Sequence, residues 1–283
     1  MSKAPARSDL PTRFAAGVLM IAISVLAVYV GGWLFRAFVL AAAAAMLLEW
    51  GDMHRVPRLW SWFAAALMAA LLLAGAEILF PVGSIDEILG EGGVGVEGIA
   101  SESFEPAWLG FGAAAAFALL VAVLSRRVAM GWGFFYIAAP AFALLAMSWA
   151  WFGLVLWTML VTWATDIFAY FAGRSIGGPK LAPRISPNKT WAGLIGGVAG
   201  AGVVGWAAAS WLDLGAPFDR AGAAIGLIAV GGDLYESGVK RRCGVKDSGR
   251  ILPGHGGVLD RLDGLLAATI ATFALLLAGL WTG

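Results

Sequence analysis

The residues best suited to chemistry gather in one segment near the C-terminus, residues 237–263. It reads SGVKRRCGVKDSGRILPGHGGVLDRLD, and it mixes basic, acidic and glycine residues beside long apolar runs. Charge of both signs next to apolar sequence indicates a site for an anionic, phosphate-bearing substrate and a metal ion at a membrane surface. The simpler alternative is a basic loop that only fixes membrane topology. Such a loop has no need of PGHGG or of DRLD, so we favour the substrate site.

Acidic residues in and near this segment are candidates for metal ligands. Asp260 and Asp263 are three residues apart and would share one face of a helix. Carboxylates without a cluster of histidines or cysteines favour a hard, oxygen-seeking cation, and Mg²⁺ is the usual ion beside phosphates. A second cation is compatible with this set. The predicted metal ligands are Asp233, Asp247, Asp260, Asp263 and Asp166. The alternative for Asp166 is a salt bridge to a loop arginine, and the alternative for Asp233 is pairing with a nearby basic residue.

Basic residues would neutralise the phosphate charge that the metal leaves uncompensated. Lysine offers a mobile point charge, and arginine offers a planar fork that matches phosphate oxygens. His255 is expected to position phosphate, with proton transfer or a purely loop-stabilising role as alternatives. The other predicted catalytic or phosphate-binding side chains are Lys240, Arg241, Lys246 and Arg261, together with Lys180 and Lys189 from a second basic loop, residues 174–190. Three prolines in that loop exclude a continuous helix.

Glycines and hydroxyls of the same segment are further candidates for substrate contact. The glycines of PGHGG let backbone N–H groups approach a phosphate closely, which makes Gly256 and Gly257 predicted contacts. Asp233, Ser237 and Lys240 are spaced four and three residues apart, so a helix would place them along one stripe. Ser237 is therefore also a predicted substrate contact.

Composition identifies the elements that must position these residues. The chain is 60% hydrophobic and only 13% charged, with a mean hydropathy of +0.84, whereas about a quarter of the residues of a soluble domain are charged. Long continuous apolar runs predict an all-α, polytopic transmembrane bundle, because helices satisfy their own backbone hydrogen bonds in lipid. The single cysteine, Cys243, excludes an intramolecular disulfide and a cysteine-rich zinc site.

The apolar runs predict about nine spans. They cover about residues 14–33, 34–50, 59–79, 107–124, 133–147, 149–173, 191–212, 221–242 and 262–281. We divide the chain into N-terminal membrane helices, residues 1–130, and a catalytic membrane region, residues 131–283. Residues 80–106 are acidic without lysine or arginine, so the positive-inside rule places them outside and places the N-terminus and the basic loops in the cytoplasm. A half-helix near Pro140 would invert everything after it.

The segment closely resembles the signature of the CDP-diacylglycerol synthases, the phosphatidate cytidylyltransferases. That signature, S-x-x-K-R-x(4)-K-D-x(5)-P-x-H-G-G-x-x-D-R-x-D, is matched from Ser237 to Asp263. Upstream, the resemblance continues through D-x-x-A-Y-x-x-G-R at residues 166–174, I-S-P-x-K-T at residues 185–190 and G-D-L at residues 232–234. Within these motifs it implies further substrate contacts at Tyr170, Ser186 and Asn188. The family often has glutamate where this chain has Ala192, so no role of that glutamate is carried over.

The resemblance implies a nucleotidyltransferase of phospholipid biosynthesis that makes CDP-diacylglycerol and pyrophosphate from CTP and phosphatidic acid. It further implies Mg²⁺ dependence, a homodimer, no nucleic-acid partner and a place in the lipid bilayer of a bacterial inner membrane. A transporter of an anionic solute is the alternative from another class, although its charges should lie near the bilayer midplane. A CTP-dependent lipid kinase is the second alternative, and it would release CDP instead of pyrophosphate.

Overall fold

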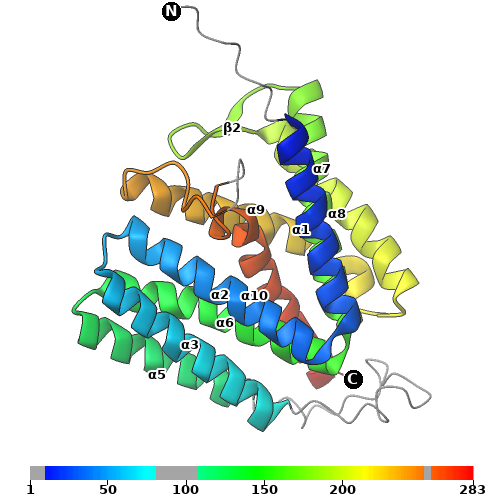
Figure 1. The fold of residues 1–283 in the computed structure, drawn as a ribbon. Coiled ribbons are helices and arrows are strands. Elements are labelled where there is room, and N and C mark those ends of the chain that lie inside the picture. Colours follow the sequence, from blue (N-terminus) through cyan, green and yellow to red (C-terminus); the bar gives the residue numbers. More distant parts are fainter. Residues whose placement is uncertain (1–9, 81–106, 252–255, 283) are drawn as a thin grey trace, which may run out of the picture.

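The computed structural model describes residues 10–80, 107–251 and 256–282, and these form a bundle of long helices (Figure 1). Acidic residues 81–106 and His255 lie outside the described residues, so the predictions that concern them stay predictions. The described helices are α1 Leu10–Val30, α2 Gly32–Met53, α3 Arg58–Leu79, α5 Ala107–Ser125, α6 Val128–Ala150, α7 Phe152–Ser175, α8 Trp191–Trp211, α9 Phe218–Arg242 and α10 Leu259–Thr282.

The all-α membrane fold is confirmed, whereas the number of spans is not. Among the described residues, seven helices are long and apolar enough to cross a membrane: α2, α3, α5, α6, α7, α8 and α10. For α1 this count includes only residues 17–30, and in α9 charged residues occupy both ends. Helix α6 continues through Pro140 as one helix of 23 residues, so the half-helix that would invert the later topology does not occur there.

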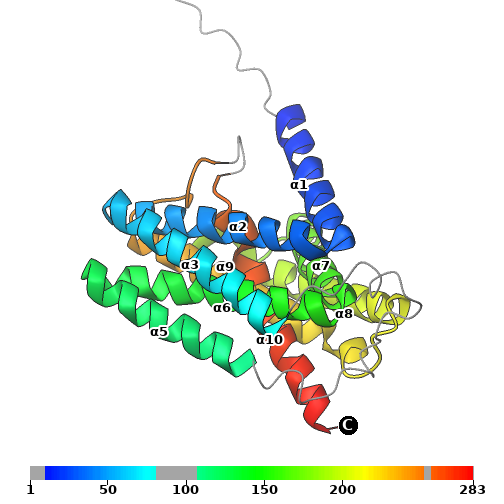
Figure 2. The ribbon, with the colours of Figure 1, turned by 60° about the horizontal axis from the view of Figure 1, so that its bottom comes forward.

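The helices pack in two groups that α10 joins. Helices α2, α3, α5 and α6 lie side by side, and α7, α8 and α9 pack against one another, while α10 contacts α6, α7 and α9 (Figure 1, Figure 2). Glycines allow the close approach of α8 to its neighbours, as its GLIGGVAGAGVVG sequence predicts. A Cβ added at Gly197 would lie 2.8 Å from the Thr165 carbonyl oxygen of α7, and one added at Gly205 would lie 2.8 Å from Gly222 Cα of α9.

A short antiparallel hairpin follows α7 and replaces the helix that its prolines exclude. Strand β1, Lys180–Ala182, pairs with β2, Ser186–Thr190, so that Lys180 lies opposite Thr190. Thr190 then caps α8, because its Oγ1 accepts a hydrogen bond of 3.0 Å from Gly193 N. The hairpin is thereby fixed beside the ends of α7, α8 and α9 (Figure 1).

Candidate active site

A cavity of about 820 Å³ lies where α1, α2, α7, α9 and α10 meet. Its size is that of a ligand site, for which roughly 300–1,000 Å³ is usual. One part of its wall is apolar and comes from α1 and α2, with Met20, Ile21 and Phe38 among the lining residues. The other part is charged and holds all five predicted metal ligands with two of the predicted basic residues: Asp166, Asp233, Asp247, Asp260, Asp263, Lys240 and Arg261.

A second cavity, of about 450 Å³, shares Asp166 with the first. It brings together three further predicted contacts, Tyr170, Asn188 and Lys189, from α7 and the hairpin. Several other predicted residues line neither cavity: Lys180, Ser186, Ser237, Arg241, Lys246, Gly256 and Gly257. Their roles toward the substrate stay predictions.

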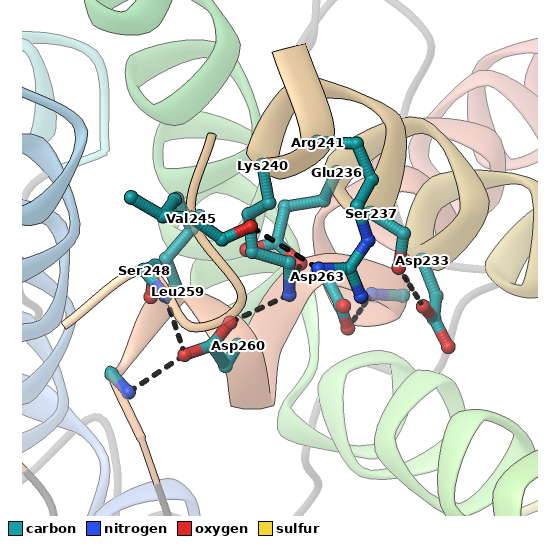
Figure 3. Close-up of polar contacts among 12 residues, drawn as sticks. Asp233, Glu236, Ser237, Lys240, Arg241, Val245, Ser248, Leu259, Asp260 and Asp263 are labelled. Carbon is teal, nitrogen blue, oxygen red and sulfur yellow. Dashed lines mark hydrogen bonds and ion pairs between the residues drawn. The ribbon is translucent and has the colours of Figure 1, made fainter. Parts of the chain in front are cut away.

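Lys240 lies at the centre of a buried ion-pair cluster (Figure 3). Its Nζ is 2.8 Å from Glu236 Oε2 and 2.6 Å from Asp260 Oδ1, and it is only 8% exposed. Asp260 Oδ2 accepts hydrogen bonds of 2.8 Å from Ser248 N and from Gly257 N. Both Asp260 oxygens are thus occupied by the protein, which makes this residue an organiser of the turn before α10.

Asp233 and Asp263 have different partners from Asp260. Asp233 forms an ion pair with Lys189 and accepts a hydrogen bond of 3.2 Å from Ser237 Oγ. Asp263 Oδ1 accepts a hydrogen bond of 2.7 Å from Gly264 N. Lys189 reaches Asp233 from β2, so the hairpin and α9 meet at this ion pair.

The arrangement suits a cation that arrives with phosphate. Among the described residues, no three acidic, histidine or cysteine side chains are gathered tightly enough to hold a metal ion. The cavity nevertheless offers carboxylate oxygens from Asp233, Asp263 and Asp166 on three different helices. Mg²⁺ is commonly held by one or two carboxylates with water and substrate phosphates completing its shell, so the donor set fits this ion.

Arg241 serves the scaffold. Its Nη1 donates to Val245 O at 3.2 Å (Figure 3), and its Nε donates to Ile185 O at 3.2 Å, so it ties the hairpin to the loop after α9.

Glu236, which was not among the predicted site residues, is fully buried and pairs with Lys240. Its position three residues after Asp233 and four before Lys240 on the same helical stripe was a signal that could have found it.

Gly232 brings Asp233 next to α10. A Cβ at this position would lie 2.7 Å from Ala267 Cβ and 2.8 Å from the Asp263 carbonyl oxygen. Gly232→Ala is therefore expected to push α9 away from α10, to lower the stability by about 1–3 kcal/mol and to reduce activity. The matched control is Gly231→Ala, since no heavy atom lies within 4 Å of its added Cβ. Thermal unfolding and turnover of the two variants check this expectation, and equal behaviour would contradict it.

The fold and the cavity together define a class: a polytopic helical membrane protein whose site combines carboxylates and basic groups with an apolar wall. Within this class the chain belongs to the cytidylyltransferase family, whose model matches residues 11–278. It is 36% identical over 274 residues to a phosphatidate cytidylyltransferase of Brucella abortus, covering 92% of this chain and 91% of that protein. It is 41% identical over 169 residues to the phosphatidate cytidylyltransferase of Pseudomonas aeruginosa, covering 55% of this chain and 59% of that protein.

Proposed function

We propose that this protein is a Mg²⁺-dependent phosphatidate cytidylyltransferase, which joins CTP and phosphatidate to give CDP-diacylglycerol and pyrophosphate. The observation that carries the proposal is the two-sided cavity, with apolar walls from α1 and α2 and charged walls from α7, α9 and α10. A lipid phosphate such as phosphatidate needs an apolar wall for its acyl chains and a charged wall for its phosphate. A nucleoside triphosphate such as CTP needs the charged wall. The relatives' activity agrees with this proposal.

In the proposed reaction, an oxygen of the phosphatidate monoester attacks the α-phosphorus of CTP. The new P–O bond forms as the bond between the α-phosphorus and the bridging oxygen breaks, and pyrophosphate leaves with that oxygen. A phosphate dianion needs no deprotonation to act as nucleophile, so alignment and charge neutralisation supply the catalysis. Arg261 and Lys189, which line the two cavities, would neutralise phosphate charge there, Lys189 in addition to its ion pair with Asp233. Bound Mg²⁺ would polarise the phosphoryl oxygens, with Asp233 and Asp263 as its protein ligands.

The function is tested by following which phosphate of labelled CTP enters the lipid. Purified protein in detergent receives phosphatidate, Mg²⁺ and CTP that is labelled on either the α- or the γ-phosphate. Label from the α-phosphate is expected in the lipid fraction, and label from the γ-phosphate is expected in pyrophosphate. Lipid labelled from the γ-phosphate would instead identify a CTP-dependent lipid kinase. The absence of any nucleotide consumption would refute both enzymes.

The proposed orientation puts the site on the cytoplasmic side of the inner membrane. Cys243, the chain's single cysteine, follows α9 directly and reports on this side. Burial raises the pKa of its thiol, and Arg55 opposes this shift more weakly, so labelling should be done above neutral pH where more thiolate forms. A membrane-impermeant maleimide is expected to label inverted vesicles and to spare intact cells. Cys243→Ser supplies the blank, and labelling of intact cells would reverse the orientation.

The homodimer that the family resemblance implies is proposed as well. Cross-linking of the purified protein in detergent at several protein concentrations checks it, and a monomer at all concentrations would contradict it.

A further inference from the structure

Glu49 is a buried carboxylate on α2 whose partners lie at the other end of the chain. It is 3% exposed. Its Oε1 accepts a hydrogen bond from Val258 N at 2.9 Å, and its Oε2 accepts one from Leu259 N at 2.9 Å. Ser248 Oγ donates a third hydrogen bond to Oε2 at 3.2 Å. The donors are about 200 residues away in sequence, with separations of 199, 209 and 210 residues.

These bonds make Glu49 the cap of α10, supplied by a different helix. Because α10 begins at Leu259, its first N–H groups have no partner within the helix and need an acceptor. A carboxylate is well suited to this position, since the N-terminus of a helix carries partial positive charge. The three donors also compensate the burial of a charged group, which is costly without hydrogen bonds.

Two glycines of the signature segment leave room for this carboxylate. A Cβ at Gly257 would lie 2.5 Å from Glu49 Oε2, and a Cβ at Gly249 would collide with Glu49 Oε1. Real Cβ atoms essentially never approach another heavy atom this closely. Gly257 is the second glycine of the H-G-G motif, and a Cβ there would also collide with Ser248 Oγ, so Glu49 and Ser248 would both have to shift whatever this glycine does for the substrate.

The residues that contact Glu49 also hold Asp260, a residue of the charged wall of the cavity. Ser248 donates its hydroxyl to Glu49 and its backbone N–H to Asp260. Gly257, in contact with Glu49, donates its N–H to Asp260, which in turn holds Lys240. A shift of this turn therefore moves Asp260 and, one helical turn later, Asp263.

We infer that Glu49 is a positioning residue for the transfer reaction: by binding Ser248, Val258 and Leu259, it fixes the start of α10 and so the place of Asp260, Lys240 and Asp263 in the cavity. Glu49 lines neither cavity, so it acts through these residues and not on the substrate. The inference rests on the proposed function for its effect on rate, whereas its effect on the turn is independent of that function.

The test compares Glu49→Gln with the wild type in the full-length protein. Glutamine keeps the size but replaces one accepting oxygen with an NH₂ group, which faces a donor. Hydrogen exchange of the amides at residues 248 and 257–259 is expected to accelerate on the order of tenfold, the effect of one lost hydrogen bond. Exchange in α3 and α5 should stay unchanged. The rate of CDP-diacylglycerol formation is expected to fall by up to about a hundredfold, the effect of misplacing reacting groups by about 1 Å.

Three further variants make the result specific. Asp52→Asn is the matched control, because Asp52 is an exposed carboxylate on the same helix, and it should behave as wild type. Glu49→Asp keeps both oxygens and the charge, so it should be faster than Glu49→Gln. Ser248→Ala removes one of the three hydrogen bonds to Glu49. In the wild-type background it should lower the rate several-fold, whereas in the Glu49→Gln background it should lower the rate little further, since the two residues share one interaction.

The outcomes separate the inference from the proposed function. Unchanged exchange at residues 248 and 257–259 with unchanged turnover in Glu49→Gln would overturn the inference. Faster exchange throughout the bundle would assign Glu49 to overall stability and would overturn it too. Should Glu49→Gln fail to fold, Glu49→Asp and Ser248→Ala decide by the same local exchange. If the wild type forms no CDP-diacylglycerol, the proposed function fails while the exchange result still decides whether Glu49 holds the turn.

Discussion

Lys240→Met is expected to abolish activity and to lower the stability by about 3–5 kcal/mol, the usual effect of removing one partner from a buried ion pair. The ammonium group lies between Glu236 and Asp260, at 2.8 and 2.6 Å. Methionine would leave two carboxylates in a buried environment without the cation that both contact. The sequence predicts Lys240 as a phosphate contact, and the loss of such a contact by itself would leave the fold intact. The ion pairs of Lys240 in the structure predict instead that its loss lowers the stability of the fold.

The measurement is unfolding in detergent together with turnover. Arg242→Met is the matched control, because Arg242 is an exposed basic residue in the same last turn of α9. Adding Glu236→Gln to Lys240→Met should restore part of the stability, since it removes one orphaned charge, but should not restore activity. A Lys240→Met protein with the wild-type unfolding transition would show that the cluster contributes little to the fold.

Asp263→Asn is expected to raise the Mg²⁺ concentration needed for half-maximal rate and to reduce transition-state stabilisation by several kcal/mol, roughly a thousandfold or more in rate. Asp263 lines the charged wall with Asp233 and Asp166, from a different helix than either. Asp260, in contrast, already uses one oxygen for Lys240 and the other for two backbone N–H groups. Of this predicted pair, Asp263 accepts one hydrogen bond from a backbone N–H and also contacts the Glu236 carboxylate, so a cation there would meet fewer competing donors than at Asp260.

The rate is measured against Mg²⁺ concentration for the wild type, Asp263→Asn and Asp213→Asn. Asp213 is exposed between α8 and α9 with φ of +52°, a conformation that asparagine also adopts readily, so its variant should match the wild type. If Asp263 only pairs with Arg261 or supports the start of α10, its variant should lose about 1 kcal/mol of stability with an unchanged Mg²⁺ midpoint. That result would move the proposed metal site to Asp233 and Asp247.

Much of the site could be predicted because its signals are local in sequence. Spacings of three and four residues placed Asp233, Ser237 and Lys240 on one stripe of α9, and in the structure Ser237 donates a hydrogen bond to Asp233 while Lys240 pairs with Asp260 of α10. Apolar runs predicted the membrane helices, and the prolines of residues 174–190 predicted the break that the hairpin fills. About nine spans were predicted, whereas seven of the described helices are long and apolar enough to cross a membrane, and α9 carries charged residues at both ends.

The sequence by itself determined the class of fold, the helical elements and the segment that carries the chemistry, because periodicity and composition act over a few residues. Only the tertiary structure decided which oxygen meets which donor. It gave Lys240 to Glu236 and Asp260, and it brought Glu49 of α2 to the start of α10. Contacts across 210 residues leave no local pattern in one sequence, since they depend on how whole helices pack. For this reason the carboxylate that caps α10 could be read only from the folded protein.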